Sequence, residues 1–154
     1  MAESVGVVII ILIMIIIGIA IYSSYNRNKY NEEIQQASEI NTLKLANIVS
    51  SLPEIHCTNN KISCIDILKV IAFINLMESS DSRFFYSSFF GNAYISIIQV
   101  LPNSSTFFEN EEIVLYENIP EEYVLKNPVF IPINLYNPIT NTRGFAILKV
   151  ERYA

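Results

Sequence analysis

The first part of the chain is an uninterrupted apolar stretch. No charged residue occurs from Ser4 to Tyr25, and residues 5–22 read VGVVIIILIMIIIGIAIY. A membrane span needs roughly 17–25 apolar residues, so this stretch is long enough to cross a bilayer. Burying each large aliphatic side chain is worth about 1.5–3 kcal/mol. Lipid or protein therefore has to cover the segment.

Beyond this stretch the apolar positions recur at steps of three and four, which is the helical period. The residues concerned are Tyr30, Ile34, Ala37, Leu45, Ile48 and Leu52. No glycine or proline interrupts the chain between Ile19 and Leu52, and Pro53 is a clear stop. The pattern predicts one helix from about Ser4 to Ser51. Its first half is hydrophobic all round and its second half is amphipathic.

The remainder reads as a small head with the α+β fold class. Residues 64–77 have the apolar spacing of a short helix. Strand patterns cover residues 94–101, 113–116, 129–136 and 144–150, broken by Pro, Asn and Ser clusters. We expect about four antiparallel strands packed on the second half of the long helix. The aromatic segment 83–90 (RFFYSSFF) is interpreted as core rather than as a ligand-stacking platform, because no basic residues interleave with it.

Two regions follow from this pattern, a hydrophobic helix at 1–26 and a head at 27–154 that includes the amphipathic part of the helix. The formal net charge is −5, and the ten Lys and Arg residues are scattered rather than gathered in a stripe. Nucleic acid is therefore not expected as a partner.

The two cysteines, Cys57 and Cys64, lie close together in the sequence HCTNNKISC. Such a pair suits an oxidising compartment, and a bridge would tie the loop after Pro53 to the start of the short helix. The alternatives are two free thiols or half of a metal site completed by His56. Six intervening residues do not match the usual zinc spacing, which favours the disulfide.

Candidate catalytic residues are few. His56 is the only histidine, and four glycines spread over the chain do not form a phosphate-binding loop. The acidic pairs at 111–112 and 121–122 lie beside turn-like segments and are interpreted as solvated faces. We expect no enzyme activity, no cofactor and no metal.

The sequence gives conflicting signals about the side of the membrane on which the head lies. Arg27 and Lys29 follow it, which by the positive-inside rule places the head in the cytoplasm. The cysteine pair and the Asn103-Ser-Ser acceptor pattern for N-glycosylation point to the outside instead. The conflict disappears if Met1 is a processed end from which a short basic leader has been removed.

This layout resembles a type IV pilin, most of all the archaeal pilins and archaellins. In that family a leader peptidase exposes the hydrophobic helix, the subunit waits in the cytoplasmic membrane, and an assembly machinery packs the helices into the core of a surface filament. The resemblance implies a mature start at Met1. It departs from the bacterial pattern, in which a glutamate stands at the fifth mature position, because the only candidate here is Glu3. The implied filament-core residues are Val5, Val8, Ile9, Leu12, Ile13, Ile16, Ile17 and Ile21.

The sequence is compatible with two functions. The first is a structural subunit of an extracellular filament, with copies of the chain as its partners. The second is a single-pass anchored cell-surface binding or adhesion protein that does not polymerise. An anchor needs only about 20 apolar residues followed by a flexible tether, whereas this helix is expected to continue into the head. That difference favours the filament subunit.

Overall fold

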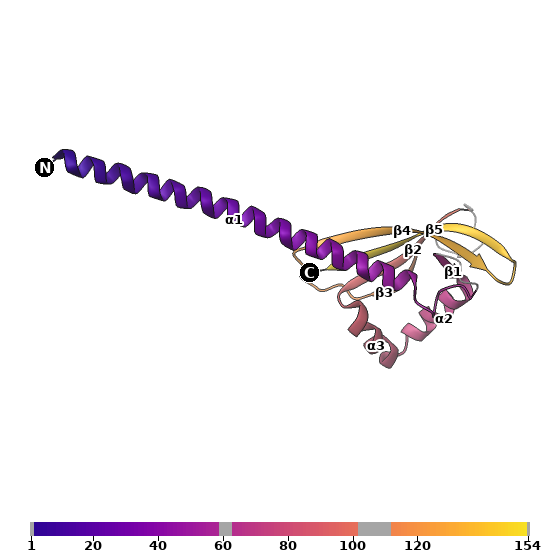
Figure 1. The fold of residues 1–154 in the computed structure, drawn as a ribbon. Helices are drawn as coiled ribbons and strands as arrows, with labels where there is room; N and C mark the ends of the chain where they lie inside the picture. The colour runs from indigo at the N-terminus through magenta and orange to yellow at the C-terminus, as the bar shows by residue number, and fades with distance from the viewer. Residues whose placement is uncertain (1, 59–62, 102–111, 154) are drawn as a thin grey trace. The chain divides into compact units, whose positions relative to one another are not determined.

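A computed structural model describes residues 2–58, 63–101 and 112–153, with the backbone alone described at 2–11, 28 and 31. The chain divides into two compact units, Met1–Ala37 and Ser38–Ala154. The helix α1, Ala2–Ser50, forms the first unit and also supplies the opening turns of the second (Figure 1).

The last turns of α1 belong to the core of the second unit. Thr42, Leu45, Ala46 and Val49 are buried there, at the i, i+3, i+4 and i+7 positions of one helical face. The hydroxyl of Thr42 is satisfied inside the helix, where it donates to the carbonyl oxygen of Ser38 at 2.9 Å. The spacing of these four buried residues places them on one side of α1, where they pack in the core of the second unit.

Two short helices follow. The helix α2, Ile67–Met77, begins at Asp66, whose carboxylate accepts hydrogen bonds from the backbone N–H groups of Leu68 at 2.9 Å and Lys69 at 3.4 Å. The helix α3, Ser80–Phe90, ends at Gly91, which has a φ of +63° that a residue without a Cβ adopts readily.

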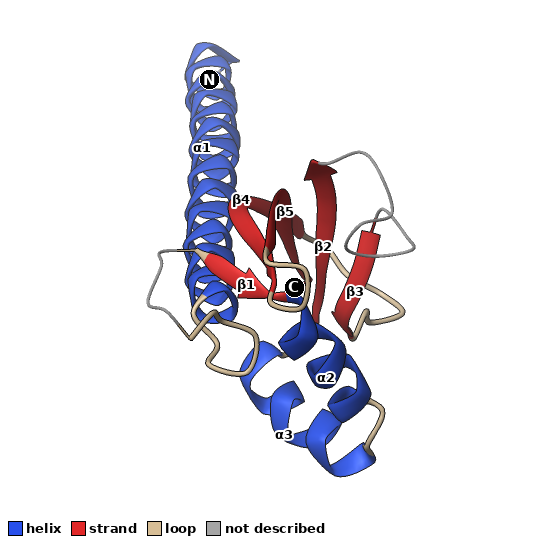
Figure 2. Ribbon diagram, turned by 90° about the vertical axis from the view of Figure 1, so that its right-hand side faces the viewer, coloured by secondary structure: helices blue, strands red, loops and turns tan. Residues whose placement is uncertain are grey.

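The sheet has five strands in the order β1-β4-β5-β2-β3. Their bounds are β1 Cys64–Asp66, β2 Ala93–Leu101, β3 Glu112–Glu117, β4 Lys126–Asn137 and β5 Thr142–Tyr153. The strand β1 runs parallel to β4, and every other pair is antiparallel (Figure 2). The tight turn between β4 and β5 places Asn141 at a φ of 52°, a conformation that asparagine tolerates better than most residues.

The two faces of the sheet have different roles. Inward-facing pairs in register are Ile95 with Val150, Ile97 with Leu148, and Ile133 with Ala146, all of them buried. This inward face shares one hydrophobic core with the end of α1, α2 and α3. The intervening residues of each strand, such as Phe130 and its register partner Lys149, lie on the opposite side, which we call the outer face.

The expected fold class is wrong in three respects. The sheet has five strands and is mixed, because the three-residue strand β1 adds a parallel pair that no sequence period reveals. A second short helix, α3, occupies a segment that was expected only to be core. The sheet is also not packed along a long apolar helix, because the buried residues of α1 within the second unit lie only between Thr42 and Val49.

The aromatic segment 83–90 also differs from its interpretation as core. Only Tyr86 and Phe90 are buried, whereas Phe84, Phe85 and Phe89 are exposed on the other side of α3. Within the part of the chain whose side chains the structure describes, no helix is both long enough and apolar enough to span a membrane.

The structure contains the disulfide between Cys57 and Cys64, and both cysteines are buried. The backbone on either side is paired as well. Cys57 donates its N–H to the carbonyl of Cys64 at 3.0 Å, and Asp66 donates to the carbonyl of Ile55 at 2.8 Å. The bridge therefore closes a loop that hydrogen bonds already bring together, next to β1 and the start of α2.

We expect the double variant Cys57→Ser/Cys64→Ser to unfold with a free energy about 2.5 kcal/mol lower than wild type. The reason is that the bridge removes loop-closure entropy from the unfolded chain over an eight-residue ring. Urea titration followed by circular dichroism measures the difference. Reduced wild type is the matched control and should behave like the variant. Equal stability of the oxidised and reduced wild type would contradict the prediction.

Candidate functional site

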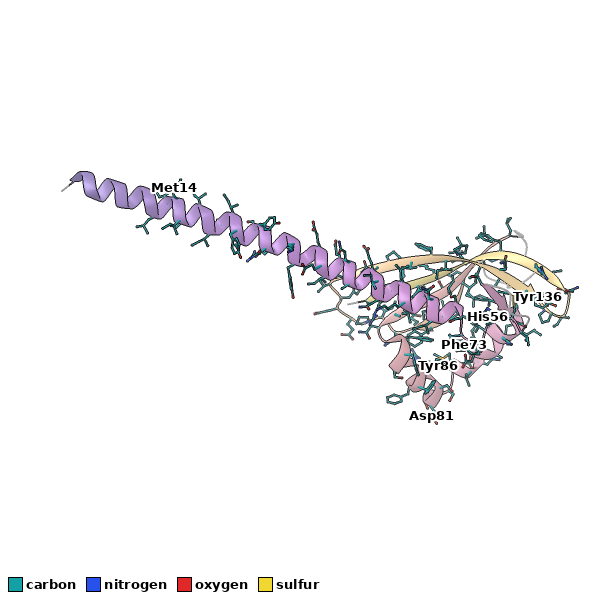
Figure 3. The ribbon with its side chains drawn as sticks, viewed as in Figure 1. Met14, His56, Phe73, Asp81, Tyr86 and Tyr136 are labelled. Carbon is teal, nitrogen blue, oxygen red and sulfur yellow. A yellow bond between two sulfur atoms is a disulfide. The ribbon has the colours of Figure 1, made fainter. Side chains whose placement is uncertain are left out.

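The most unusual surface of the described chain lies on the first unit. Eight large apolar side chains between Leu12 and Ile21 are each 49–68% exposed. Successive residues of an α-helix turn by about 100°, so these side chains point to all sides of the helix. Figure 3 shows the side chain of Met14 projecting from this part of α1. A flat partner would cover only one side of such a surface.

The structure describes part of the expected filament core. Exposed side chains are found at Leu12, Ile13, Ile16, Ile17 and Ile21. The side chains of Val5, Val8, Ile9 and Glu3 lie outside the described set, as does Met1. The glycosylation acceptor Asn103 also lies outside the described residues.

The loop around the disulfide is held onto α2 by polar contacts. The ammonium group of Lys69 donates to the carbonyl oxygens of His56 at 2.7 Å and Pro53 at 3.3 Å. His56 is half-buried rather than a free surface side chain, and its Nδ1 lies 3.0 Å from the carbonyl oxygen of Cys57. The neighbourhood of His56 is therefore structural, since its polar groups fix the path of the loop.

A cluster of charges on the outer face of the sheet was not predicted from the sequence. Lys126 Nζ lies 3.0 Å from Glu151 Oε2, and Lys149 Nζ lies 3.3 Å from Glu151 Oε1. Lys149 also lies 3.8 Å from Glu112 Oε1. We call these four residues the ionic cluster. It links the neighbouring strands β4 and β5 with β3, which β2 separates from β5 in the sheet.

Tyrosine and serine hydroxyls complete the ionic cluster. Tyr153 donates to Glu151 Oε2 at 2.9 Å. Ser96 donates to Glu112 Oε1 at 2.7 Å, and Tyr94 donates to the same oxygen at 3.1 Å. Glu151 is buried, so these partners replace the water that a carboxylate would otherwise need.

Both carboxylates have shifted acidities. Burial alone would raise the pKa of Glu151, but the hydrogen bonds from Lys126 and Tyr153, together with the charge of Lys149, outweigh it and lower that pKa. The pKa of Glu112 is lowered first by the hydrogen bond from Ser96, against burial, and further by Tyr94 and Lys149. Glu112 is exposed, as expected for a solvated face, although its carboxylate is also held by specific partners.

The sequence does carry a signal for this cluster, although a weak one. Lys149 and Glu151 stand two residues apart in β5, as Tyr94 and Ser96 do in β2, so each pair shares one face of its strand. What the sequence does not reveal is the register that aligns Lys149 with Ser96 across the strands. Long-range pairing of this kind has no local pattern.

The chemistry available to the described residues is limited. They contain no group of three or more His, Cys, Asp or Glu residues placed to hold a metal ion. The charges of the ionic cluster neutralise one another. A hollow of about 310 Å³ beside the disulfide is walled in part by Asp66, Tyr136 and Arg143. Of these, Asp66 caps α2 and Tyr136 donates to Asn141 at 3.3 Å.

Comparison with known protein families, with characterised proteins and with solved structures finds no match for this chain.

We expect Glu151→Gln to lower the free energy of unfolding by roughly 1–3 kcal/mol at neutral pH, because it removes the charge that Lys126 and Lys149 share. Because the folded-state pKa of Glu151 and Glu112 is lowered, their contribution is present above the ordinary glutamate pKa of about 4.3 and lost as the pH falls through the folded-state pKa. The gap between variant and wild type should therefore narrow in acid. Urea titrations at several pH values measure it.

The matched control is Glu121→Gln, an exposed glutamate that forms no ion pair with another described residue. Its stability should stay within about 0.5 kcal/mol of wild type at every pH. A Glu151→Gln effect that did not depend on pH would show that packing, rather than charge, accounts for the loss.

Proposed function

We propose that this chain is a structural subunit of an extracellular filament that assembles through the N-terminal segment of α1. The observation that carries the proposal is the run of eight exposed apolar side chains between Leu12 and Ile21. A helix that is apolar on all sides is found where other apolar groups surround it. Several copies of the same helix, bundled together, provide such surroundings.

Water is an unfavourable surrounding for this part of α1. Relative to water, covering each of the eight side chains contributes about 1.5–3 kcal/mol, which gives roughly 12–24 kcal/mol per copy as an upper bound. The helix must therefore be covered by lipid or by other helices. For a subunit that leaves the lipid, the driving force is the close van der Waals packing of the helices against one another. No charge within this run opposes close packing of the helices.

The disulfide supports a location outside the cytoplasm, where a surface filament would be assembled. A disulfide such as Cys57–Cys64 persists in oxidising surroundings outside the cytoplasm. The similarity of the sequence layout to archaeal type IV pilins supports the same proposal, because subunits of that family are held in the membrane before an assembly machinery packs their helices together. The partners are thus further copies of this chain, with lipid around the helix beforehand.

We expect Ile13→Asp to abolish filament formation, because an unpaired carboxylate placed among packed helices costs several kcal/mol per copy. Negative-stain electron microscopy and sedimentation of the full chain measure assembly. The disulfide and the urea stability of the head report folding, and both should be unchanged, since Ile13 lies in the first unit.

Ile13→Leu is the matched control, and it should assemble like wild type because the volume and polarity are preserved. Filaments formed by Ile13→Asp would sink the assembly proposal. So would a wild-type chain that stays monomeric in lipid vesicles and never pellets as filaments, an outcome that favours the anchored surface protein instead.

A further inference from the structure

The helix α3 carries an exposed aromatic patch. Phe84 is 80% exposed, Phe85 56% and Phe89 60%. These three residues, which we call the α3 patch, lie at i, i+1 and i+5, and the rings of Phe85 and Phe89 are 4.9 Å apart. The opposite face of the helix, with Tyr86 and Phe90, is buried in the core. The patch therefore points away from the sheet.

A second apolar patch lies on the outer face of the sheet. Phe130 is 56% exposed and Phe145 is 39% exposed, and Pro132 between them is exposed as well. We call these three residues the sheet patch. The register of β4 and β5 places Phe130 opposite Lys149 and Pro132 opposite Ile147, so the patch lies beside the ionic cluster.

The two patches lie on different sides of the second unit. The α3 patch is on the helical side of the second unit, and the sheet patch is on the side that no helix of this unit covers (Figures 1 and 2). The body of the sheet and its core separate them. A contact between two copies of the chain would bury one patch of each kind.

The charges beside the two patches are complementary. Asp81 lies three and four residues before Phe84 and Phe85, on the same face of α3. Arg143 stands two residues before Phe145, on the same face of β5. Neither charge forms an ion pair or hydrogen bond with another described residue. Figure 3 shows Asp81 at the tip of the helical side, far from Tyr136, the register partner of Arg143.

We infer that the α3 patch of one copy docks on the sheet patch of a second copy, with Asp81 facing Arg143. The two surfaces are unlike, so the contact is head-to-tail, and a head-to-tail contact that does not close into a ring propagates as an open helix. The partner is thus the same chain, and the inference rests on the proposed function because it deepens the account of that polymer.

The small area of the patches limits the affinity of the contact. A phenylalanine buries roughly 150–250 Å², so the α3 patch offers about 300–500 Å². A stable interface needs about 800 Å² from each partner. The contact between heads is therefore too small to hold two free subunits together, and it forms when packing of α1 has raised the local concentration of heads.

Mixed cysteine cross-linking tests the contact. Ser88→Cys places a thiol on the exposed face of α3 between Phe85 and Phe89, and Pro132→Cys places one in the sheet patch. The two full-length variants are mixed, concentrated in detergent or assembled, and treated with a short bismaleimide. We expect a heterodimer in the mixture, identified by mass spectrometry, and little product from either variant alone. Replacing Ser88→Cys by Glu121→Cys, an exposed site between β3 and β4, is the control and should give little product.

Charge reversal provides an independent measurement. Asp81→Lys and Arg143→Glu should each lower the yield of the heterodimer several-fold, and the two together should restore it because the pair is re-formed with opposite signs. Phe84→Ser should lower the yield about tenfold, as expected for an aromatic anchor. All three side chains are exposed, so the urea stability of each variant should match wild type.

The outcomes separate this inference from the filament proposal. Filaments without the heterodimer would overturn the head contact and leave assembly through α1 standing. The heterodimer without filaments would support the head contact while removing the proposed function. Failure of the doubly reversed pair to restore cross-linking would overturn the pairing of Asp81 with Arg143.

Discussion

The second unit depends on closing one face of its sheet. Ile97, Ile133 and Leu148 are almost fully buried on that face, and a face so apolar is stable only when another layer of the structure covers it. The cover comes from three separate segments: the last turns of α1, α2 and α3. Because Leu45 and Val49 lie in this core, the helix that carries the exposed apolar run also completes the fold of the head. A head lacking the end of α1 would leave part of the inward face uncovered.

The outer face of the sheet contains two regions that differ in how their side chains are paired. Around Glu151 every charge has a partner within the chain, so this region is stable by itself and offers little to another molecule. Around Phe145 the apolar side chains are exposed, and the side chain of Arg143 forms no ion pair or hydrogen bond with another described residue. The two regions adjoin on the same strands. A partner that docks on the sheet patch covers apolar side chains there. It does not have to remove water from the ionic cluster, which would be costly.

Local sequence patterns account for part of this fold and leave the rest hidden. The apolar run, the stop at Pro53 and the strands β2 to β5 show in periodicity, because each depends on residues close together in the chain. The strand β1 does not, since three residues are too few to set a period and its pairing with β4 joins Cys64 to Asn134. The segment from Arg83 to Phe90 was also ambiguous. Aromatic residues suit helix and core alike, and only the packing of Tyr86 against Phe73, with ring centroids 5.0 Å apart, decides which face is inside.

The proposed assembly combines a strong contact with a weak one, and each supplies what the other lacks. Packing of apolar helices is strong but carries little directional information, since the side chains from Leu12 to Ile21 are similar on all sides of the helix. A contact between the α3 patch and the sheet patch is small, but it is directional because it joins two different surfaces with opposite charges. Packing of such helices alone would therefore leave the register of neighbouring subunits weakly specified. In the proposed assembly, the heads determine the register of neighbouring subunits, and the helices provide most of the free energy that keeps them together.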